Sequence, residues 1–234
     1  MPHLRPLQVS MVLAAAFTLA APLAWGQVPP SPTEIERYQG LHTAAHQGNL
    51  SQLEAVLATG GPLDARDSHG RTPLHVATFA RQPEAVRRLI QAGARHDLLD
   101  ADRYDAVTIA AVADDEPTLA ALLASGASAR LTTSVYDGTA LIAAAHLGHD
   151  GVVRQLIAAG APLDHVNNLH WTAVIESIVL GNGGLRHQAT LAALIAAGAN
   201  LQLTDRQGHT PLQLARSRGY TTMEQMLERA GARW

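Results

Sequence analysis

The strongest constraint on the fold is a sequence pattern that returns about every 33 residues. A glycine follows an apolar, leucine-rich stretch six times, with spacings of 33, 33, 34, 38 and 33 residues. These glycines are Gly60, Gly93, Gly126, Gly160, Gly198 and Gly231. Self-similarity at such a period indicates a repeat architecture, in which each unit buries its apolar face only against its neighbours.

Each period carries the signals of two helices. At residues 72–75 the sequence reads Thr-Pro-Leu-His, where threonine can cap a helix and proline is tolerated at the first helical position. A second helix is indicated by the apolar spacing of Val86, Leu89 and Ile90. Glycine then ends it, because the left-handed conformation that terminates many helices is cheap for glycine alone. The unit is therefore a helix–turn–helix.

The period near 33 and the Thr-Pro-Leu-His motif resemble the ankyrin family, and the resemblance covers residues 38–234. Further copies of the motif stand at residues 139–144 and 210–215. The resemblance implies an all-α repeat solenoid of about six ankyrin repeats, each a helix–turn–helix unit, with β-hairpin loops between them.

Two units depart from the pattern. The third has Asp105 where the capping threonine would stand, and aspartate can also cap a helix. The fifth is five residues longer, because residues 181–188 expand the turn between its two helices, and it has Glu176 and Ser177 where other units have aliphatic residues and alanine. Whether the insertion takes part in binding is left open at this point.

The N-terminus predicts export. A basic start with Arg5 is followed by an apolar run and by small residues before a cut after Gly26, which describes a signal peptide at residues 1–26. An uncleaved anchor is the alternative, but the run is shorter than the roughly 20 residues that span a bilayer. The cut could equally lie a residue or two away. We therefore expect a periplasmic or secreted protein, without stable membrane insertion once the signal is removed.

Residues 27–37 are rich in proline, with Pro29, Pro30 and Pro32, and predict an extended linker before the repeats. The chain has no cysteine, so no disulfide can stabilise it and no lipid can be attached through a cysteine to anchor it to a membrane. Its 17 basic and 20 acidic residues supply no basic patch for nucleic acid and no polybasic attraction to lipid.

The sequence contains none of the common catalytic motifs, so we expect a protein that is not an enzyme and needs no cofactor. Twelve histidines leave one rival interpretation, a metal- or small-molecule-binding protein that uses surface histidines such as His42 and His46. Against it, His42 and His75 stand at the motif histidine, which in the ankyrin family hydrogen-bonds the backbone between neighbouring repeats.

The resemblance implies that loop tips and inner helices bind another protein, which is expected to be exported as well, while the chain itself is expected to be a monomer. Aromatic residues and arginine dominate protein interfaces. The predicted contact residues at the loop tips are His69, Arg71, Tyr104, Tyr136, Trp171, Arg206 and His209, and those on the inner helices are Phe79 and His146. The alternative for each ring is that it packs between adjacent loops and stabilises the stack. The partner's identity, and whether the role is inhibition, stabilisation or scaffolding, cannot be read from the residues.

Overall fold

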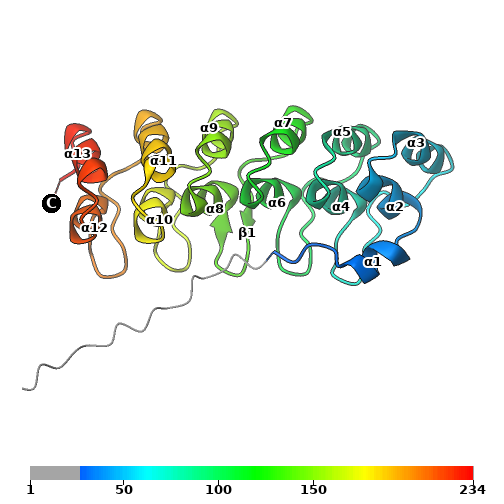
Figure 1. Ribbon diagram of the computed structural model, residues 1–234, viewed down its shortest axis with the longest axis horizontal. Coiled ribbons are helices and arrows are strands. Elements are labelled where there is room, and N and C mark those ends of the chain that lie inside the picture. Colours follow the sequence, from blue (N-terminus) through cyan, green and yellow to red (C-terminus); the bar gives the residue numbers. More distant parts are fainter. Residues whose placement is uncertain (1–26, 234) are drawn as a thin grey trace, which may run out of the picture.

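The computed structural model describes residues 27–233, so the expected signal peptide at residues 1–26 lies outside the described residues. Six antiparallel helix pairs stand side by side in one row (Figure 1). In chain order, repeats 1 to 6 are α2 (Gly40–Gln47) with α3 (Leu50–Ala58), α4 (Pro73–Phe79) with α5 (Pro83–Gln91), α6 (Ala106–Val112) with α7 (Glu116–Ala124), α8 (Ala140–Leu147) with α9 (Asp150–Ala158), α10 (Ala173–Val179) with α11 (Leu185–Ala196), and α12 (Pro211–Ser217) with α13 (Thr221–Arg229). The predicted solenoid of six helix–turn–helix units is confirmed.

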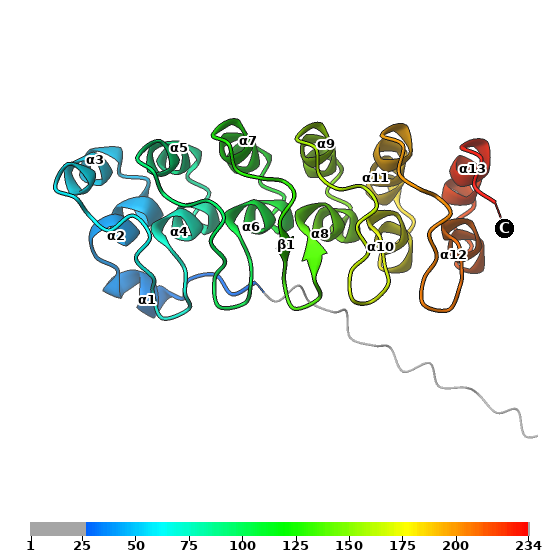
Figure 2. The same cartoon turned by 180° about the vertical axis from the view of Figure 1, so that it is seen from behind.

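Consecutive pairs are joined by loops whose tips lie along one edge of the row (Figure 2). Each loop is named here by the repeat that it enters: hairpin 2 (residues 67–71), hairpin 3 (100–104), hairpin 4 (132–139), hairpin 5 (167–171) and hairpin 6 (205–209). Among the described residues, strand pairing is regular only in hairpin 4, where β1 (Thr132–Thr133) and β2 (Gly138–Thr139) run antiparallel. The other hairpins are tight turns.

These turns are shaped by one side chain at their first residue. In hairpin 2, Asp67 Oδ1 accepts the backbone N–H groups of His69 and Arg71 at 2.8 and 2.9 Å. Asp100, Asn167 and Asp205 do the same in hairpins 3, 5 and 6. A side-chain oxygen that satisfies two backbone donors fixes the path of the loop without a regular strand.

Neighbouring tips are also joined to one another by the main chain. The N–H of Ala101 donates to His69 O at 2.9 Å, and Ser134 N–H donates to Arg103 O at 2.7 Å. Asn168 N–H continues the series to Tyr136 O at 3.0 Å. Hairpins 2 to 5 therefore form one hydrogen-bonded row.

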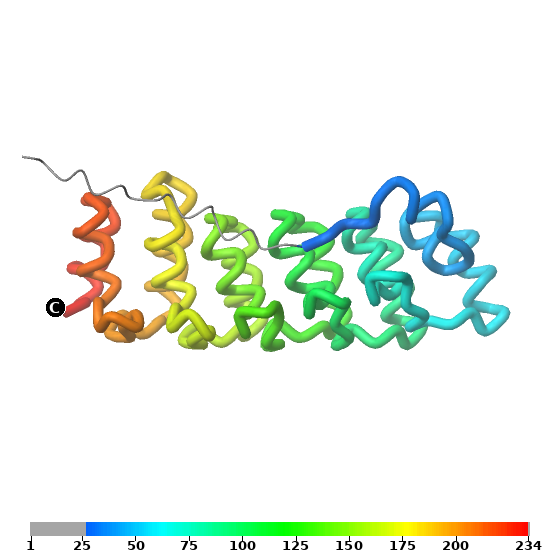
Figure 3. Tube along the Cα trace, turned by 90° about the horizontal axis from the view of Figure 1, so that it is seen from below, coloured from blue at the N-terminus to red at the C-terminus, as the bar shows by residue number. Residues whose placement is uncertain are grey.

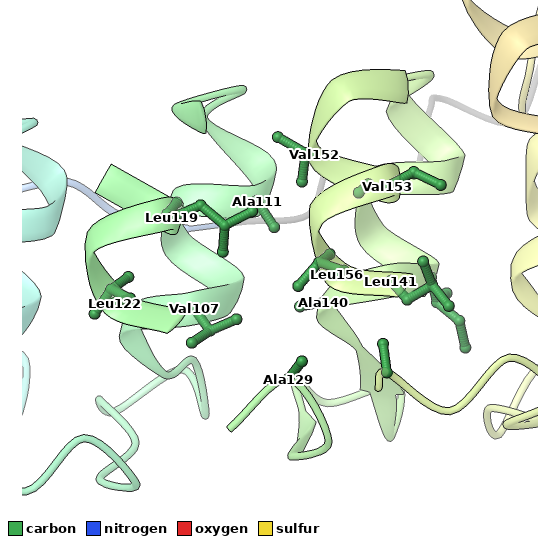
Figure 4. Packing of buried hydrophobic residues seen from close by; sticks show 14 of the residues in the cluster. Val107, Ala111, Leu119, Leu122, Ala129, Ala140, Leu141, Val152, Val153 and Leu156 are labelled. Atoms are coloured by element: carbon green, nitrogen blue, oxygen red, sulfur yellow. The ribbon is translucent and has the colours of Figure 1, made fainter. Parts of the chain in front are cut away.

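The core lies between the helix layers and runs through the stack. Between repeats 3 and 4 it is filled by fully buried side chains such as Leu119, Val152 and Leu156 (Figure 4). The first helices contribute small residues, including Ala111 and Ala144, which are fully buried and allow helices of adjacent repeats to pack closely. Each repeat thus depends on its neighbours for burial.

Asp105 caps helix α6, as predicted. Its carboxylate accepts the N–H of Thr108 at 2.9 Å, which is what the threonines do at other helix starts. Unlike a threonine, it is an ionisable group that is only 1% exposed. Burial raises the pKa of Asp105 to about 6, because the charged form loses its hydration.

The segment before the repeats differs from the expected extended linker in its second half, which forms helix α1 (Pro32–Arg37). Ser31 Oγ accepts from Glu34 N–H, and the Glu34 carboxylate accepts Ser31 N–H at 2.9 Å. Such a capping box, with Pro32 at a position that needs no donor, favours a helix despite the proline content. Seen from below, this segment crosses the first repeats (Figure 3).

The insertion in repeat 5 is divided between a turn and a longer helix. Residues 181–184 form the turn, while α11 has 12 residues where α9 has nine. His187 Nε2 donates to His146 O at 2.9 Å, and Tyr220 Oη donates to Gly181 O at 2.9 Å. The insertion is therefore fastened to the repeats on both sides. Within residues 27–233, no helix has the length and apolar character that a bilayer crossing needs.

Candidate partner-binding surface

One loop position recurs in four hairpins, and it holds four of the predicted contact residues. It is the residue just before the helix cap, occupied by Arg71, Tyr104, Trp171 and His209. Its backbone N–H is held by the carboxylate or amide at the loop start. The exposure of the side chain nevertheless differs widely along the row: Arg71 is fully buried, Tyr104 is 3% exposed, Trp171 is partly exposed and the His209 side chain is 53% exposed.

Arg71 is not available to a partner, which corrects the prediction made for it. Its guanidinium donates to Asp67 Oδ2 at 2.7 Å and to Val28 O at 3.0 Å, and it forms an ion pair with Glu34. Two of these acceptors belong to the segment before the repeats. That segment therefore occupies the surface that Arg71 would otherwise present.

His69 is engaged by the same segment. Its Nδ1 lies 2.7 Å from Glu34 Oε1, although 44% of the His69 side chain remains exposed. The hydrogen bond from the Ser31 backbone, together with the Ser31 hydroxyl and Arg71, holds the pKa of Glu34 down at about 2. The acid is thus ionised throughout the ordinary pH range and holds α1 against hairpin 2.

Tyr104 also differs from the prediction that it contacts a partner. It is almost completely buried, and burial raises the pKa of its hydroxyl to about 12. For this ring the alternative interpretation holds, namely that it packs within the stack. The physical reason is the close approach of hairpins 3 and 4, which the bond from Ser134 N–H to Arg103 O fixes at 2.7 Å.

The C-terminal hairpins do present side chains. Tyr136 and Trp171 are partly exposed on adjacent hairpins 4 and 5, and Val135 beside them is 61% exposed. Their loops are tied by Asn168, whose N–H and Nδ2 donate to Tyr136 O and Val135 O at 3.0 and 2.9 Å. These contacts bring apolar and aromatic groups of two repeats together on a rigid support.

Hairpin 6 adds polar groups to the same edge. Arg206 is exposed, and its Nη2 donates to Asn168 O at 2.8 Å. His209 Nδ1 lies 3.1 Å from Asp205 Oδ2. Both predicted residues therefore lie on the surface, each with one intramolecular partner that fixes its orientation.

The two predicted inner-helix residues lie apart. Phe79 ends α4 and is partly exposed, whereas His146 lies near the end of α8 with 10% of its side chain exposed. His146 Nδ1 is 3.2 Å from Glu176 Oε2, and Asn167 Nδ2 donates to Glu176 Oε1 at 2.9 Å. Glu176 itself is 1% exposed, and a buried carboxylate is tolerated because both of its oxygens find partners.

This buried group explains why hairpin 5 begins with an asparagine. The aspartates that begin hairpins 2, 3 and 6 would place a second carboxylate beside Glu176, whereas the Asn167 amide accepts for the loop with one end and donates to Glu176 with the other. Sequence reasoning missed this pairing. The signal was present in the sequence as two departures from the repeat, nine residues apart.

The motif histidines link neighbouring repeats. His42 Nε2 donates to Arg71 O and His75 Nε2 donates to Tyr104 O, both at 3.1 Å. Burial lowers the pKa of His75 to about 4, so it is neutral near pH 7. Over residues 27–233, no group of three or more histidine, aspartate or glutamate side chains is placed to hold a metal ion.

Comparison with known proteins agrees with this architecture. The family model for ankyrin repeats (3 copies) matches residues 14–100 and 107–205, which together make up more than half of the chain. The chain belongs to the ankyrin-repeat family. Proteins of this family generally mediate protein–protein interaction, and homologous ankyrin repeats are typically non-enzymatic binding scaffolds.

Relatives of similar length are found among bacterial ankyrin proteins. The chain is 34% identical over 190 residues to ankyrin repeat protein YahD of Escherichia coli (strain K12), which covers 81% of this chain and 94% of that protein. A solved ankyrin repeat domain from Acinetobacter baumannii AYE is 44% identical with a TM-score of 0.78, and covers 82% of this chain and 98% of that one. The ankyrin repeat domain of Bcl-3, a member of the IkappaB family, is 29% identical with a TM-score of 0.76, over 84% and 87% of the two chains.

In this ankyrin-repeat protein the hairpin edge is thus divided into two parts. Hairpins 2 and 3 have Arg71 and Tyr104 buried, and hairpin 2 is covered by the chain's own N-terminal segment. Hairpins 4 to 6 expose Val135, Arg206 and His209, with Tyr136 and Trp171 partly exposed. The candidate surface is the second part.

Proposed function

We propose that this chain is a scaffold that binds another exported protein through hairpins 4 to 6, acting in the periplasm or outside the cell as an accessory subunit, inhibitor or stabiliser. The observation that carries the proposal is the adjacency of Tyr136, Trp171 and the 61% exposed Val135 on two hairpins that are tied together. Aromatic side chains on a preformed support bury a large area with little loss of conformational entropy.

The exported setting is supported by the sequence of residues 1–26, with its basic start, apolar run and small residues before Gly26. The direct test is fractionation of cells that express the tagged chain, followed by N-terminal analysis of the product. We expect the chain outside the cytoplasm with an N-terminus at or within two residues of Gln27. An intact Met1 on a cytoplasmic product would overturn this part of the proposal.

Binding is tested by crosslinking in intact cells and affinity capture of the tagged chain, with the wild type beside the double variant Tyr136→Ala, Trp171→Ala. Loss of a central aromatic contact costs about 2 kcal/mol or more, which corresponds to about 30-fold in affinity. We expect a specific partner to be captured by the wild type and lost from the double variant, while circular dichroism shows that both remain folded.

The matched control is Leu185→Ala. Leu185 is 82% exposed and apolar, but it lies on the insertion of repeat 5 rather than at the hairpin tips. We expect this variant to capture the partner as the wild type does. If the wild type captures no specific protein, the proposed function is wrong, and if only Leu185→Ala loses the partner, the binding surface is wrongly placed.

A further inference from the structure

Two of the four tight hairpins hold a non-glycine residue in the left-handed backbone conformation at their tip, and the longer hairpin 4 holds two more, Ser134 and Asp137. The fourth residue of hairpins 2 and 6 is Gly70 or Gly208, with φ of 70° and 84°. The same position in hairpins 3 and 5 is Arg103, with φ of 64°, and His170, with φ of 63°. A residue with a Cβ atom is disfavoured there, so a side chain is retained at these tips where glycine would suit the fold better.

The fold itself gains little from either side chain. His170 is exposed, and its side chain makes no hydrogen bond or ion pair with any residue between 27 and 233. Arg103 Nη2 lies 3.1 Å from Asp137 Oδ1, but both side chains are about half exposed, at 49% and 50%. Ion pairs that are this exposed contribute little to stability.

Two other left-handed residues show what an intramolecular role looks like. Arg81, with φ of 54°, donates from Nη2 to Ala113 O in the next repeat at 2.7 Å. Asp114, with φ of 52°, accepts from Arg186 at 2.7 Å. Both lie in the turns between the two helices of a repeat, away from the hairpin tips. Their side chains link repeats. Arg103 also links two repeats, through its half-exposed pair with Asp137, whereas the His170 side chain has no partner among residues 27–233 and is open to a use outside the chain.

The chemistry of that use follows from which charges face outward. The acids Asp67, Asp100 and Asp205 are turned into their own loops, where each accepts two backbone N–H groups. The exposed donors Arg103, His170, Arg206 and His209 lie on hairpins 3 to 6, which contain two carboxylates besides those that shape the turns, Asp102 and Asp137. A donor-rich edge of this kind fits carboxylates, because arginine binds them with two parallel hydrogen bonds.

We propose that Arg103 and His170, together with Arg206, bind the carboxylates of an acidic segment of the protein partner. This inference rests on the proposed function and adds the chemical class of the partner surface. The segment lies along hairpins 3 to 6, which extends the candidate surface by the exposed tip of hairpin 3, and Tyr136 and Val135 of hairpin 4 contact its apolar groups. The Asp137 carboxylate now beside Arg103 is exchanged for one from the partner.

The probe is a fluorescently labelled hexaglutamate peptide, with a hexaglutamine peptide of the same length as its control, and binding is followed by anisotropy at low and at 0.2 M salt. We expect the wild type to bind hexaglutamate in preference to hexaglutamine, and to lose this preference at high salt because exposed charges are screened. The double variant Arg103→Gly, His170→Gly should bind about fivefold more weakly, since exposed charge contacts are individually modest.

The same double variant separates binding from folding. Glycine relieves the left-handed strain, so we expect its melting temperature to equal or exceed that of the wild type. The matched control is Arg81→Gly, which makes the same change at a left-handed position in an interhelical turn and should bind hexaglutamate as the wild type does. A wild type that does not distinguish the two peptides, or a double variant with unchanged affinity, overturns the inference.

Cellular capture distinguishes this failure from a failure of the proposed function. In one outcome, the partner is lost from the Tyr136→Ala, Trp171→Ala variant but is still captured by the Arg103→Gly, His170→Gly variant. This outcome supports the scaffold proposal and rejects the binding of an acidic segment. Absence of any specific partner for the wild type removes both. Loss of the captured partner from both double variants, together with the hexaglutamate result, supports the whole proposal.

Discussion

Hairpins 2 and 6 place Arg71 and His209 at the same position of the repeat, with opposite outcomes. Arg71 is fully buried and bound by Val28, Glu34 and Asp67, whereas the His209 side chain is 53% exposed and has one partner in its own loop. The local turn is the same in both, because an aspartate accepts the same two backbone N–H groups. The difference in side-chain exposure comes from the segment before the repeats, which covers the turn of hairpin 2 through Val28 and Glu34.

The comparison shows that the position in the repeat determines the backbone conformation of a residue. It does not determine whether the side chain is exposed to a partner. Segment 28–37 satisfies Arg71 in the first part of the row and excludes a partner there. No comparable segment among the described residues covers hairpins 5 and 6, where His170, Arg206 and His209 are exposed. Hairpin 2, at one end of the edge, therefore stabilises the fold. Hairpins 5 and 6, at the other end, bind the partner in our proposal.

The largest expected effect is that of Arg71→Ala. It leaves the carboxylates of Asp67 and Glu34 without their buried cation, and removal of one partner from a buried pair costs about 3–5 kcal/mol. His209→Ala, at the same repeat position, should change the free energy of unfolding in urea by no more than about 0.5 kcal/mol. Trypsin should also cut the Arg71 variant faster after Arg37, because α1 loses its anchor. Equal losses in the two variants would break the comparison.

Asp105→Thr tests a second difference between the two parts of the row. The helix that follows hairpin 3 is capped by a buried carboxylate, whereas the helices that follow hairpins 5 and 6 are capped by threonine. The pKa of Asp105 is raised from 3.8 to about 6 in the folded chain, so its stability contribution is fully present below pH 4 and is lost as the pH rises through 6. The threonine variant should therefore be more stable by about 1–3 kcal/mol at pH 7.5.

The pH profile provides the check on this prediction. The gain from Asp105→Thr should shrink to about 0.5 kcal/mol near pH 4, where the carboxyl is protonated in the folded chain and about half protonated in the unfolded chain. His75, whose lowered pKa acts with the opposite sign, titrates in both proteins and cancels in the difference. Urea unfolding at pH 4 and 7.5 measures the effect, and a gain that is the same at both pH values would contradict it.

An effect smaller than those of Arg71→Ala and Asp105→Thr is expected for Arg186→Ala. Arg186 pairs with Asp114 of repeat 3 at 2.7 Å and with Asp150 of repeat 4 at 3.5 Å, but 54% of its side chain is exposed. We expect a loss of at most about 1 kcal/mol, which shrinks further in 0.5 M salt. A loss that salt does not change would show that the side chain stabilises the stack by packing rather than by charge.

The repeat architecture was predictable because its signals are local. The glycine that ends each second helix and the Thr-Pro start of the first lie within a few residues of the backbone that they control, and Asp105 was identified as a cap for the same reason. Exposure was not predictable in this way. Arg71 is buried by residues about 40 positions earlier, and Glu176 is satisfied by His146 from the preceding repeat.

The exposure of the predicted contact residues was therefore predicted only in part. Trp171, Arg206 and His209 lie on the surface as expected, and Tyr136 lies beside them. Arg103 was absent from the prediction, since nothing local distinguishes an arginine that has replaced a left-handed glycine from one in an ordinary turn. Its backbone angle, which only the structure gives, identifies it.

The main-chain hydrogen bonds between hairpin tips allow the opening of single junctions between repeats to be measured by hydrogen exchange. Amide protons at loop tips usually exchange with solvent rapidly, but those of Ala101, Ser134 and Asn168 are each donated across one junction between repeats. Their exchange rates in deuterated water therefore time the opening of three successive junctions, each through a single residue. At the junction between hairpins 5 and 6 the hydrogen bond comes from the Arg206 side chain instead. Exchange of a backbone amide in hairpin 6 therefore does not report the opening of this junction.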